Sequence, residues 1–464
     1  MTAMGNSPRA RDIANVLHPY TNLAVHETSG PLIIERGKGI YVFDDSGKEY
    51  IEGLAGLWCT SLGFAEEELI QAAVQQMRKL PYYHIFGHKA SMPSIELAER
   101  LKAIAPAPFS KTLFVNSGSE ANDTQVKLIW YYNNAIGRPK KKKIIGRIRG
   151  YHGVTLMSAS LTGLPNNHRD FDLPLPGVLH TDCPHHYHFA EPGETEEQFA
   201  TRLADNLEKM IVKEGPETVA AFIAEPVMGA GGVIVPPRTY FEKVQAVLKK
   251  YDVLLVADEV ICGFGRTGNM WGCETYGMKP DTLSCAKQLS SAYLPIAAVM
   301  VSEPIYRAMV DESRKIGVFA HGFTYGGHPV PAAVALKTLE LYEKRDMLGH
   351  VRKVMPHFQA RLKRLGDHPL VGEARGVGLI GGVELVADKK AKRNFAPARG
   401  VGGYFSTRAH EHGLIARAMV NDTVGICPPL IITESEIDEL FDRFEKALAD
   451  TEAWVAKEGL RKAA

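Results

Sequence analysis

The feature that most restricts the fold is an alternation between about residues 61 and 320, where short apolar runs are separated by amphipathic stretches. This pattern is typical of βα units packed around a mostly parallel sheet. The separating stretches include 121–135 and 239–251, in which apolar residues recur at helical spacing. The predicted strands are TLFV (112–115), KIIGRI (143–148), VAAFIA (219–224), VLLVA (253–257), TLSCA (282–286) and IAAVMV (296–301). The sequence therefore predicts an α/β fold with a large domain built on a mostly parallel central sheet.

The two ends of the chain have a different character. Residues 39–53 fit two strands around a tight turn. Beyond residue 331 the sequence predicts long helices, then a mixture of short strands, a helix around 402–412 and a final helix from about 434. We therefore expect a small α+β domain built from both termini. The predicted divisions are 1–60 for its N-terminal segment, 61–325 for the large domain and 326–464 for its C-terminal part.

Composition argues against several classes of partner. Lys and Arg number 54 against 53 Asp and Glu, which gives a net charge of +1 and no reason to expect nucleic-acid binding. The first residues contain no apolar stretch of the length of a signal peptide or a membrane span, so a cytoplasmic protein without a membrane partner is expected. The segment from Cys183 to His188 packs its possible ligands too closely for a zinc tetrahedron, and no metal site is predicted.

Polar residues follow several predicted strands, at the carboxyl edge where open α/β sheets bind ligands. Ser117, Gly118 and Ser119 come after the first strand and begin a helix, whose N-terminus favours a phosphate. A helix that is merely capped by Ser is the alternative. Tyr151 and His152 lie between two glycines after the second strand, where an aromatic ring could stack on a flat heterocycle or simply pack in the core.

The next three strands end in ionisable residues. Glu225 follows the third strand and is either a contact near a cofactor or a structural carboxylate. Asp258 ends an apolar strand, where an acid is costly unless paired; a protonated pyridine nitrogen, a helix cap or a magnesium ion would satisfy it. Lys287 follows TLSCA, and desolvation there would give a neutral amine able to form an imine, although a lysine at a strand end can also face solvent.

Taken together, NSGSEAN, GYHG, AEP, LLVADEV and GFGRTG, followed by a lysine after a short strand, resemble the class III pyridoxal-phosphate (PLP) aminotransferases of fold type I. The resemblance covers nearly the whole chain. It implies the cofactor pyridoxal 5'-phosphate, held as a Schiff base by Lys287, which would also shuttle the proton. The implied cofactor contacts are Ser117, Gly118 and Ser119 at the phosphate, Tyr151 and Val260 on the ring faces, Asp258 at the ring nitrogen, and His152 and Glu225 nearby.

The family also completes the phosphate site with a threonine of a partner subunit, and Thr324 in HGFTYGGHP matches that place. The resemblance therefore implies a homodimer with shared active sites, possibly a tetramer. One departure concerns residues 287–293, KQLSSAY, because the family often has Gly after the lysine and again before the tyrosine. The geometry of this loop therefore cannot be carried over from the family.

Further residues resemble the omega (amine:pyruvate) transaminase subgroup. Arg417 matches an arginine that binds the acceptor's carboxylate and swings aside for an uncharged amine. The implied substrate-binding residues are Leu57, Trp58, Phe86, Tyr151, Ala230, Ile261, Phe323 and Arg417. The expected reaction transfers an amino group from an amine to a 2-oxo acid, pyruvate being favoured. Two alternatives stay open: a 2-oxoglutarate-dependent omega-aminotransferase, and an aminomutase, decarboxylase or racemase of the same fold.

Overall fold

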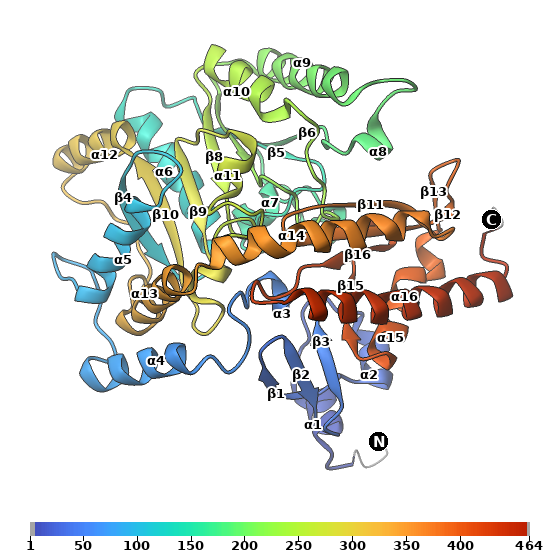
Figure 1. The fold of residues 1–464 in the computed structure, drawn as a ribbon. Coiled ribbons are helices and arrows are strands. Elements are labelled where there is room, and N and C mark those ends of the chain that lie inside the picture. Colours follow the sequence, from blue (N-terminus) through green and yellow to red (C-terminus); the bar gives the residue numbers. More distant parts are fainter. Residues whose placement is uncertain (1–4, 462–464) are drawn as a thin grey trace.

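A computed structural model describes residues 5–461 and places a seven-stranded sheet at its centre (Figure 1). The strand order is β4-β10-β9-β8-β7-β5-β6. Only β10 runs antiparallel to its neighbours, so the sheet is mostly parallel as predicted. Its strands are β4 (Phe109–Val115), β5 (Lys143–Arg147), β6 (Val178–Thr181), β7 (Val219–Ala224), β8 (Leu254–Asp258), β9 (Thr282–Cys285) and β10 (Ala297–Ser302).

All six predicted strands of this sheet are present, within a few residues at either end. The seventh, β6, was not predicted. It is an edge strand of four residues, and its inner two positions, Leu179 and His180, are only partly buried. A strand so short and so weakly apolar gives little periodic signal.

The helices predicted from the sequence are confirmed within three residues at each end where bounds were given. They are α6 (Gly118–Ala135), α10 (Tyr240–Lys250), α13 (Pro329–Lys344), α14 (Met347–Arg364), α15 (Val401–Glu411) and α16 (Glu434–Lys457). The remaining α-helices are α1 (Pro8–Asn15), α2 (Leu23–Ser29), α3 (Ala55–Trp58), α4 (Glu67–Lys79), α5 (Met92–Ala103), α7 (Leu156–Leu161), α8 (His186–Phe189), α9 (Glu196–Glu214), α11 (Gly272–Tyr276) and α12 (Glu303–Ile316). Short 3₁₀ helices include η2 (Lys287–Ser290). Within residues 5–461, each helix is too short or too polar to cross a bilayer.

Two smaller sheets join the ends of the chain. One has the order β1-β2-β3-β14, in which β14 pairs in parallel with β3. The other has the order β11-β12-β16-β15, with β13 beside β12. Their strands are β1 (Ile34–Lys38), β2 (Tyr41–Asp44), β3 (Glu49–Glu52), β11 (Val371–Val377), β12 (Ile380–Asp388), β13 (Arg393–Asn394), β14 (Leu414–Ile415), β15 (Arg417–Ala418) and β16 (Thr423–Ile426). The β3–β14 pairing brings N- and C-terminal segments together; the divisions at residues 60 and 325 stay predictions.

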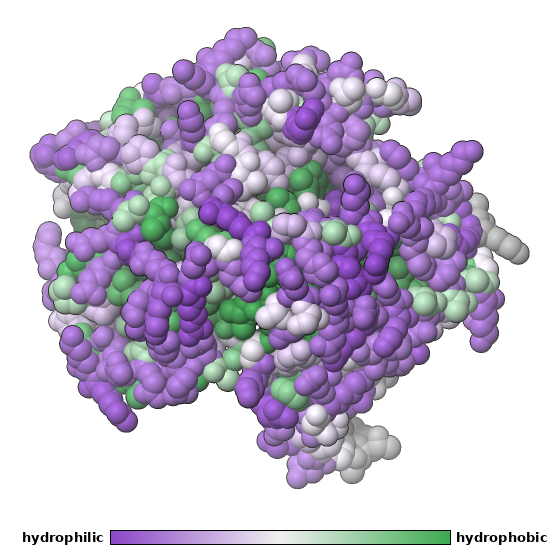
Figure 2. All heavy atoms as spheres, viewed as in Figure 1, coloured by the Kyte–Doolittle hydropathy of each residue, from purple (hydrophilic) through white to green (hydrophobic). Residues whose placement is uncertain are grey.

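The face seen in Figure 2 is mostly hydrophilic, with apolar residues gathered near its middle. Inside, β7 is buried along its whole length, and the following strand positions Asp258 at 3% exposure. A central strand buried on both faces needs a continuous apolar run, which VAAFIA supplies. The sheet is therefore a rigid platform whose carboxyl edge carries the polar residues described next.

Candidate active site

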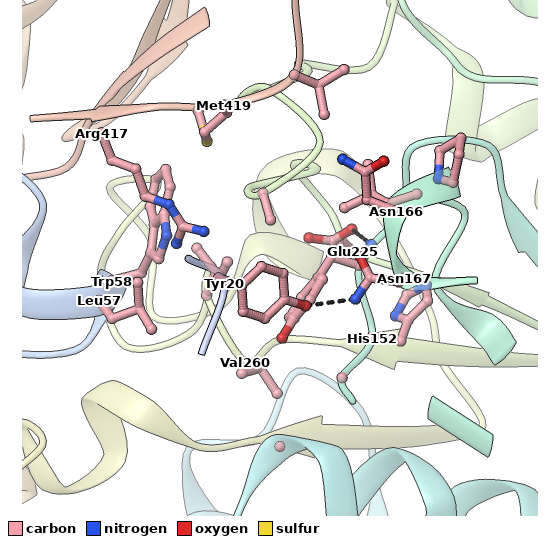
Figure 3. A pocket seen from close by; sticks show the side chains of 18 of the residues that line it. Tyr20, Leu57, Trp58, His152, Asn166, Asn167, Glu225, Val260, Arg417 and Met419 are labelled. Atoms are coloured by element: carbon pink, nitrogen blue, oxygen red, sulfur yellow. Dashed lines mark hydrogen bonds between the residues drawn. The ribbon is translucent and has the colours of Figure 1, made fainter. Parts of the chain in front are cut away.

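A cavity of about 910 Å³ opens at the carboxyl ends of β5, β7, β8 and β9 (Figure 3). Most of the predicted site residues line it. They are Leu57, Trp58, Gly118, Ser119, Tyr151, His152, Glu225, Ala230, Asp258, Val260, Ile261, Lys287 and Arg417. The position agrees with the rule that ligands bind outside the carboxyl edge of such sheets.

Asp258 lies at the floor of this cavity and is held by two neighbouring side chains. Its Oδ2 accepts hydrogen bonds from Asn122 Nδ2 at 2.7 Å and His152 Nδ1 at 2.8 Å. Its Oδ1 accepts only the Val260 N–H, at 3.1 Å, among the described residues. Because a carboxylate oxygen can accept two hydrogen bonds, Oδ1 keeps one position for a cationic ring N–H. This arrangement fits the pyridine nitrogen of the predicted cofactor.

Lys287 follows β9, which is hydrogen-bonded to β8, so the lysine and Asp258 come from adjacent strands. Burial lowers the pKa of the Lys287 amine, while the nearby thiol of Cys59 and the carboxylate of Asp258 oppose this shift. Lys287 also has a left-handed φ of 50°, a conformation that costs energy in a residue other than glycine and is concentrated at functional sites. A lysine with a lowered pKa supplies more of the neutral amine needed as a nucleophile.

The departure from the family at residues 287–293 has a structural explanation. Gln288 is fully buried and its Nε2 donates to the carbonyls of Ile261 and Gly263, at 2.8 Å each. The Ser291 hydroxyl accepts the Leu62 N–H at 2.9 Å, and Ala292 has a φ of 64°. The loop is thus fixed by side-chain hydrogen bonds, and Ala292 adopts the left-handed conformation that glycine would favour.

Glu225 connects two loops at the floor of the cavity. Its carboxylate oxygens accept the N–H groups of Tyr151 and Gly229, each at 3.0 Å. Burial raises the pKa of Glu225, and nearby His152 opposes that shift. This carboxylate therefore has a structural role in fixing the backbone of Tyr151 and also lines the cavity, and its place near a cofactor stays a prediction.

The residues at the start of α6 are small, and their contacts explain why. Ser117 is the N-cap, its hydroxyl accepting the Glu120 N–H at 3.1 Å, and it does not line the cavity. A Cβ at Gly118 would lie 3.0 Å from Val260 Cγ1. The missing side chain therefore keeps space between the helix N-terminus and Val260, which suits a bound ring and phosphate. With Asp258 and Lys287, these residues fit pyridoxal 5'-phosphate.

The outer wall comes from the ends of the chain. Figure 3 shows Trp58 and Leu57 beside Arg417, whose strand β15 belongs to the second small sheet. Trp58 is 2% exposed and packs in a cluster with Ile261 and Met419. Among residues 5–461, Arg417 forms no ion pair with an acidic side chain; its guanidinium lies 5.8 Å from the Tyr20 ring. A cationic group facing the cavity without an acid suits a carboxylate ligand.

Several lining residues were not predicted. Asn122 is the last residue of the NSGSEAN motif, but no role was predicted for it, and its contact with Asp258 appears only in the folded chain. Tyr20 comes from the connection between α1 and α2, and its hydroxyl accepts a hydrogen bond from Asn167 Nδ2 at 2.5 Å (Figure 3). Burial, with Tyr20 close by, raises the pKa of the Tyr151 phenol. The other unpredicted lining residues are Gly153, Leu164, Pro165, Asn166, Asn167, Arg169, Phe395, Pro397, Met419, Val420, Asn421 and Asp422.

Besides Ser117, three predicted residues do not line the cavity of their own chain. Phe86, Phe323 and Thr324 lie on two segments that pack together elsewhere: the Thr324 carbonyl accepts the Tyr82 hydroxyl at 2.7 Å. A Cβ on Gly322, next to Phe323, would lie 3.0 Å from the Phe86 ring. Phe86 is 48% exposed. Their placement in a shared site of a homodimer stays a prediction.

The Cys183–His188 segment joins the second small sheet through a network of hydrogen bonds and ion pairs. His185 Nε2 lies 2.8 Å from Glu373, and His188 Nε2 lies 2.5 Å from Glu384. Arg375 Nη1 bridges both carboxylates, at 2.7 and 3.0 Å. Burial lowers the pKa of His185 to about 4. The guanidinium already supplies the positive charge that a metal ion would bring.

The chain is similar to known proteins in both sequence and fold. The family model Aminotransferase class-III matches residues 23–448. Gamma aminobutyrate transaminase 3, chloroplastic, of Solanum lycopersicum is 54% identical over 97% of this chain and 88% of that protein. The crystal structure of the omega transaminase from Pseudomonas jessenii in complex with PMP is 57% identical, with a TM-score of 0.95 over 97% of this chain and 99% of that one. A transaminase solved with L-alanine is 59% identical, with a TM-score of 0.90 over 91% and 100% of the two chains.

Proposed function

The chain belongs to the class III aminotransferases, and we propose that this pyridoxal-phosphate transaminase moves the amino group of an amine donor to pyruvate. The observation that carries the choice of acceptor is Arg417, a guanidinium on the outer wall that pairs with no acid in the described part of the chain. One guanidinium can hold one carboxylate through two parallel hydrogen bonds. Pyruvate has a single carboxylate, and its remaining group is only a methyl.

When bound, PLP supplies an aldehyde that reacts with amines and a ring that withdraws electrons from the reacting carbon. Lys287 Nζ would take the proton from the donor carbon and deliver it to the carbon that carried the cofactor's aldehyde. Asp258 Oδ1 would keep the ring N–H cationic, and Asn122 and His152 hold the other carboxylate oxygen in place. This electrostatic support grows as charge develops, so it acts mainly in the transition state.

The donor side is served by the apolar wall of Leu57, Trp58 and Ile261. An uncharged amine would pack there once Arg417 turns away, since a guanidinium is costly beside an apolar group. A relative named for γ-aminobutyrate and a transaminase solved with L-alanine both support substrates with one carboxylate. L-Alanine is the product that pyruvate forms when it accepts the amino group.

The test is kinetic and uses Arg417→Gln. Losing a charge-assisted hydrogen-bond pair costs about 1.5–3 kcal/mol, so KM for pyruvate should rise roughly 10–100-fold. The rate with an aldehyde acceptor that has no carboxylate should change little. Arg169→Gln is the matched control, because Arg169 lines the same cavity at an exposed position.

A preference for 2-oxoglutarate over pyruvate would contradict the proposed acceptor. In that case Arg169→Gln should raise KM for 2-oxoglutarate, since a second carboxylate needs a second cation. The other reaction types are tested by the cofactor's absorbance. Transamination predicts that amine abolishes the absorbance of the lysine-bound cofactor and that pyruvate restores it; a decarboxylase, aminomutase or racemase would not require pyruvate for recovery.

A further inference from the structure

A second cluster of metal-ligand side chains lies near the N-terminus. Asp12 Oδ1 lies 2.9 Å from His18 Nε2 and 3.2 Å from His26 Nε2. One ligand atom from each of the three residues lies within 4.8 Å of the other two. Asp12 belongs to α1 and His26 to α2, with His18 in the connection between them. The cluster therefore joins both helices of the segment that precedes β1, which we call the N-terminal segment (residues 7–30).

The geometry points to a site for a divalent transition metal, with zinc the best fit, at Asp12, His18 and His26. Two imidazoles and one carboxylate are a ligand set that zinc accepts, and in tetrahedral coordination neighbouring ligand atoms lie about 3.3 Å apart. The two Asp–His distances are already within a few tenths of an ångström of that value. The side chains of Asp12 and His18 are 19% and 26% exposed, which leaves water access for a fourth ligand.

The charges around this cluster support a cation there. Among residues 5–461, Asp12 pairs with no lysine or arginine, only with the two histidines. The His18 and His26 rings are tilted by 31° to one another with centroids 4.1 Å apart, so two imidazolium charges there would repel one another. The His185–His188–Glu384 cluster meets the same distance criterion but already contains the Arg375 guanidinium. The Asp12–His18–His26 cluster, by contrast, contains no ion pair with an arginine or lysine among residues 5–461.

The site has a consequence for the cavity because Tyr20 lies two residues after His18. The Tyr20 hydroxyl accepts a hydrogen bond from Asn167, and its ring faces Arg417. Tyr20 itself is 60% exposed, so few contacts of its own hold it in place. A metal ion that ties His18 to α1 and α2 would fasten the N-terminal segment in the position that delivers Tyr20 to the outer wall.

The test measures zinc binding to untagged, PLP-loaded enzyme after treatment with a chelator. Titration calorimetry and atomic spectroscopy should find one zinc ion per chain at this site. His18→Gln and His26→Gln should each weaken binding by more than the roughly 10–100-fold caused by losing an outer-shell partner. His412→Gln is the matched control, because His412 pairs with Asp450 at 2.7 Å but is in no three-ligand group among the described residues. This control should bind zinc as the unaltered enzyme does.

A second measurement follows the N-terminal segment itself. Zinc should slow tryptic cleavage at exposed Arg11 in the unaltered enzyme and in His412→Gln, but not in the two ligand variants. Equal PLP content in all four proteins checks that the variants are folded. Zinc binding that is the same in the ligand variants, or protection from trypsin that does not depend on zinc, would overturn the inference.

Discussion

Lys287 and Asp258 reach the cavity from adjacent strands of one sheet, whereas Tyr20 and Arg417 reach its opposite wall from near the two ends of the chain. The first pair is held by two adjacent strands of the central sheet that are buried except at Leu254. The second pair depends on the small sheets and on the N-terminal segment, with Tyr20 60% exposed. One side is therefore built for fixed geometry and the other for adjustment.

This difference matches what each side has to do. Proton transfer and charge stabilisation need groups fixed to within fractions of an ångström, which packed strands provide. Under the proposed function the outer wall accepts either a carboxylate or an apolar group, which would require side chains that can rearrange, such as long ones on peripheral segments. Substitutions at the sheet edge should therefore reduce the rate of chemistry, and those on the outer wall should change KM or stability.

The largest effect is expected for Lys287→Ala. Removing the amine eliminates both the covalent attachment and the proton transfer, and proton transfer alone contributes roughly 10²–10⁴-fold. Turnover with amine and pyruvate should fall below detection in a steady-state assay. Transamination near the unaltered rate would show that the sheet edge does not hold the reacting lysine.

Asp258→Asn should have the next largest effect. The amide cannot balance a cationic ring nitrogen, and losing one group that stabilises developing charge typically costs about 10²–10³-fold in rate. Single-turnover measurements with amine isolate this half of the reaction. A loss of less than tenfold would mean that Asn122 and His152 orient a carboxylate whose charge has little influence on the chemistry.

The sheet edge and the outer wall also differ in how well their residues could be predicted from the sequence. Asp258, Lys287 and Glu225 lie at or just beyond the ends of mostly buried strands of four to six residues, so their positions at one edge could be predicted from the alternation of strands and helices. Arg417 was identified only because the sequence resembles a known family. Strands β14 and β15 have two residues each and give no periodic pattern. Tyr20 was missed because a tyrosine in a loop carries no local signal. Asn122 closes the NSGSEAN motif, but its contact with Asp258 appears only in the folded chain.

The smallest effect is expected for Glu52, which precedes the turn to Leu57 and Trp58 of the outer wall. This residue ends β3, is 6% exposed, and its carboxylate accepts the Leu54 N–H at 3.0 Å. It thereby supports the turn that leads to Trp58. The backbone of Trp58 has a left-handed φ of 65°. Burial raises the pKa of Glu52 to about 7, against the partly compensating backbone hydrogen bonds from Leu54 and Gly56.

A raised pKa in the folded state means that the folded protein holds this proton more tightly than the unfolded chain. The free energy of unfolding should therefore fall as pH rises from the ordinary carboxyl pKa, near 4.5, to about 7. Glu52→Gln keeps an acceptor for the Leu54 N–H and removes the charge. Its effect on the free energy of unfolding should therefore be more stabilising at pH 8 than at pH 5, by up to about 3 kcal/mol. Urea unfolding at the two pH values measures this, with exposed Glu35→Gln as control. A Glu52→Gln effect that is equal at both pH values would mean that Glu52 is already ionised in the folded protein at pH 5, and that the outer wall tolerates a buried charge there.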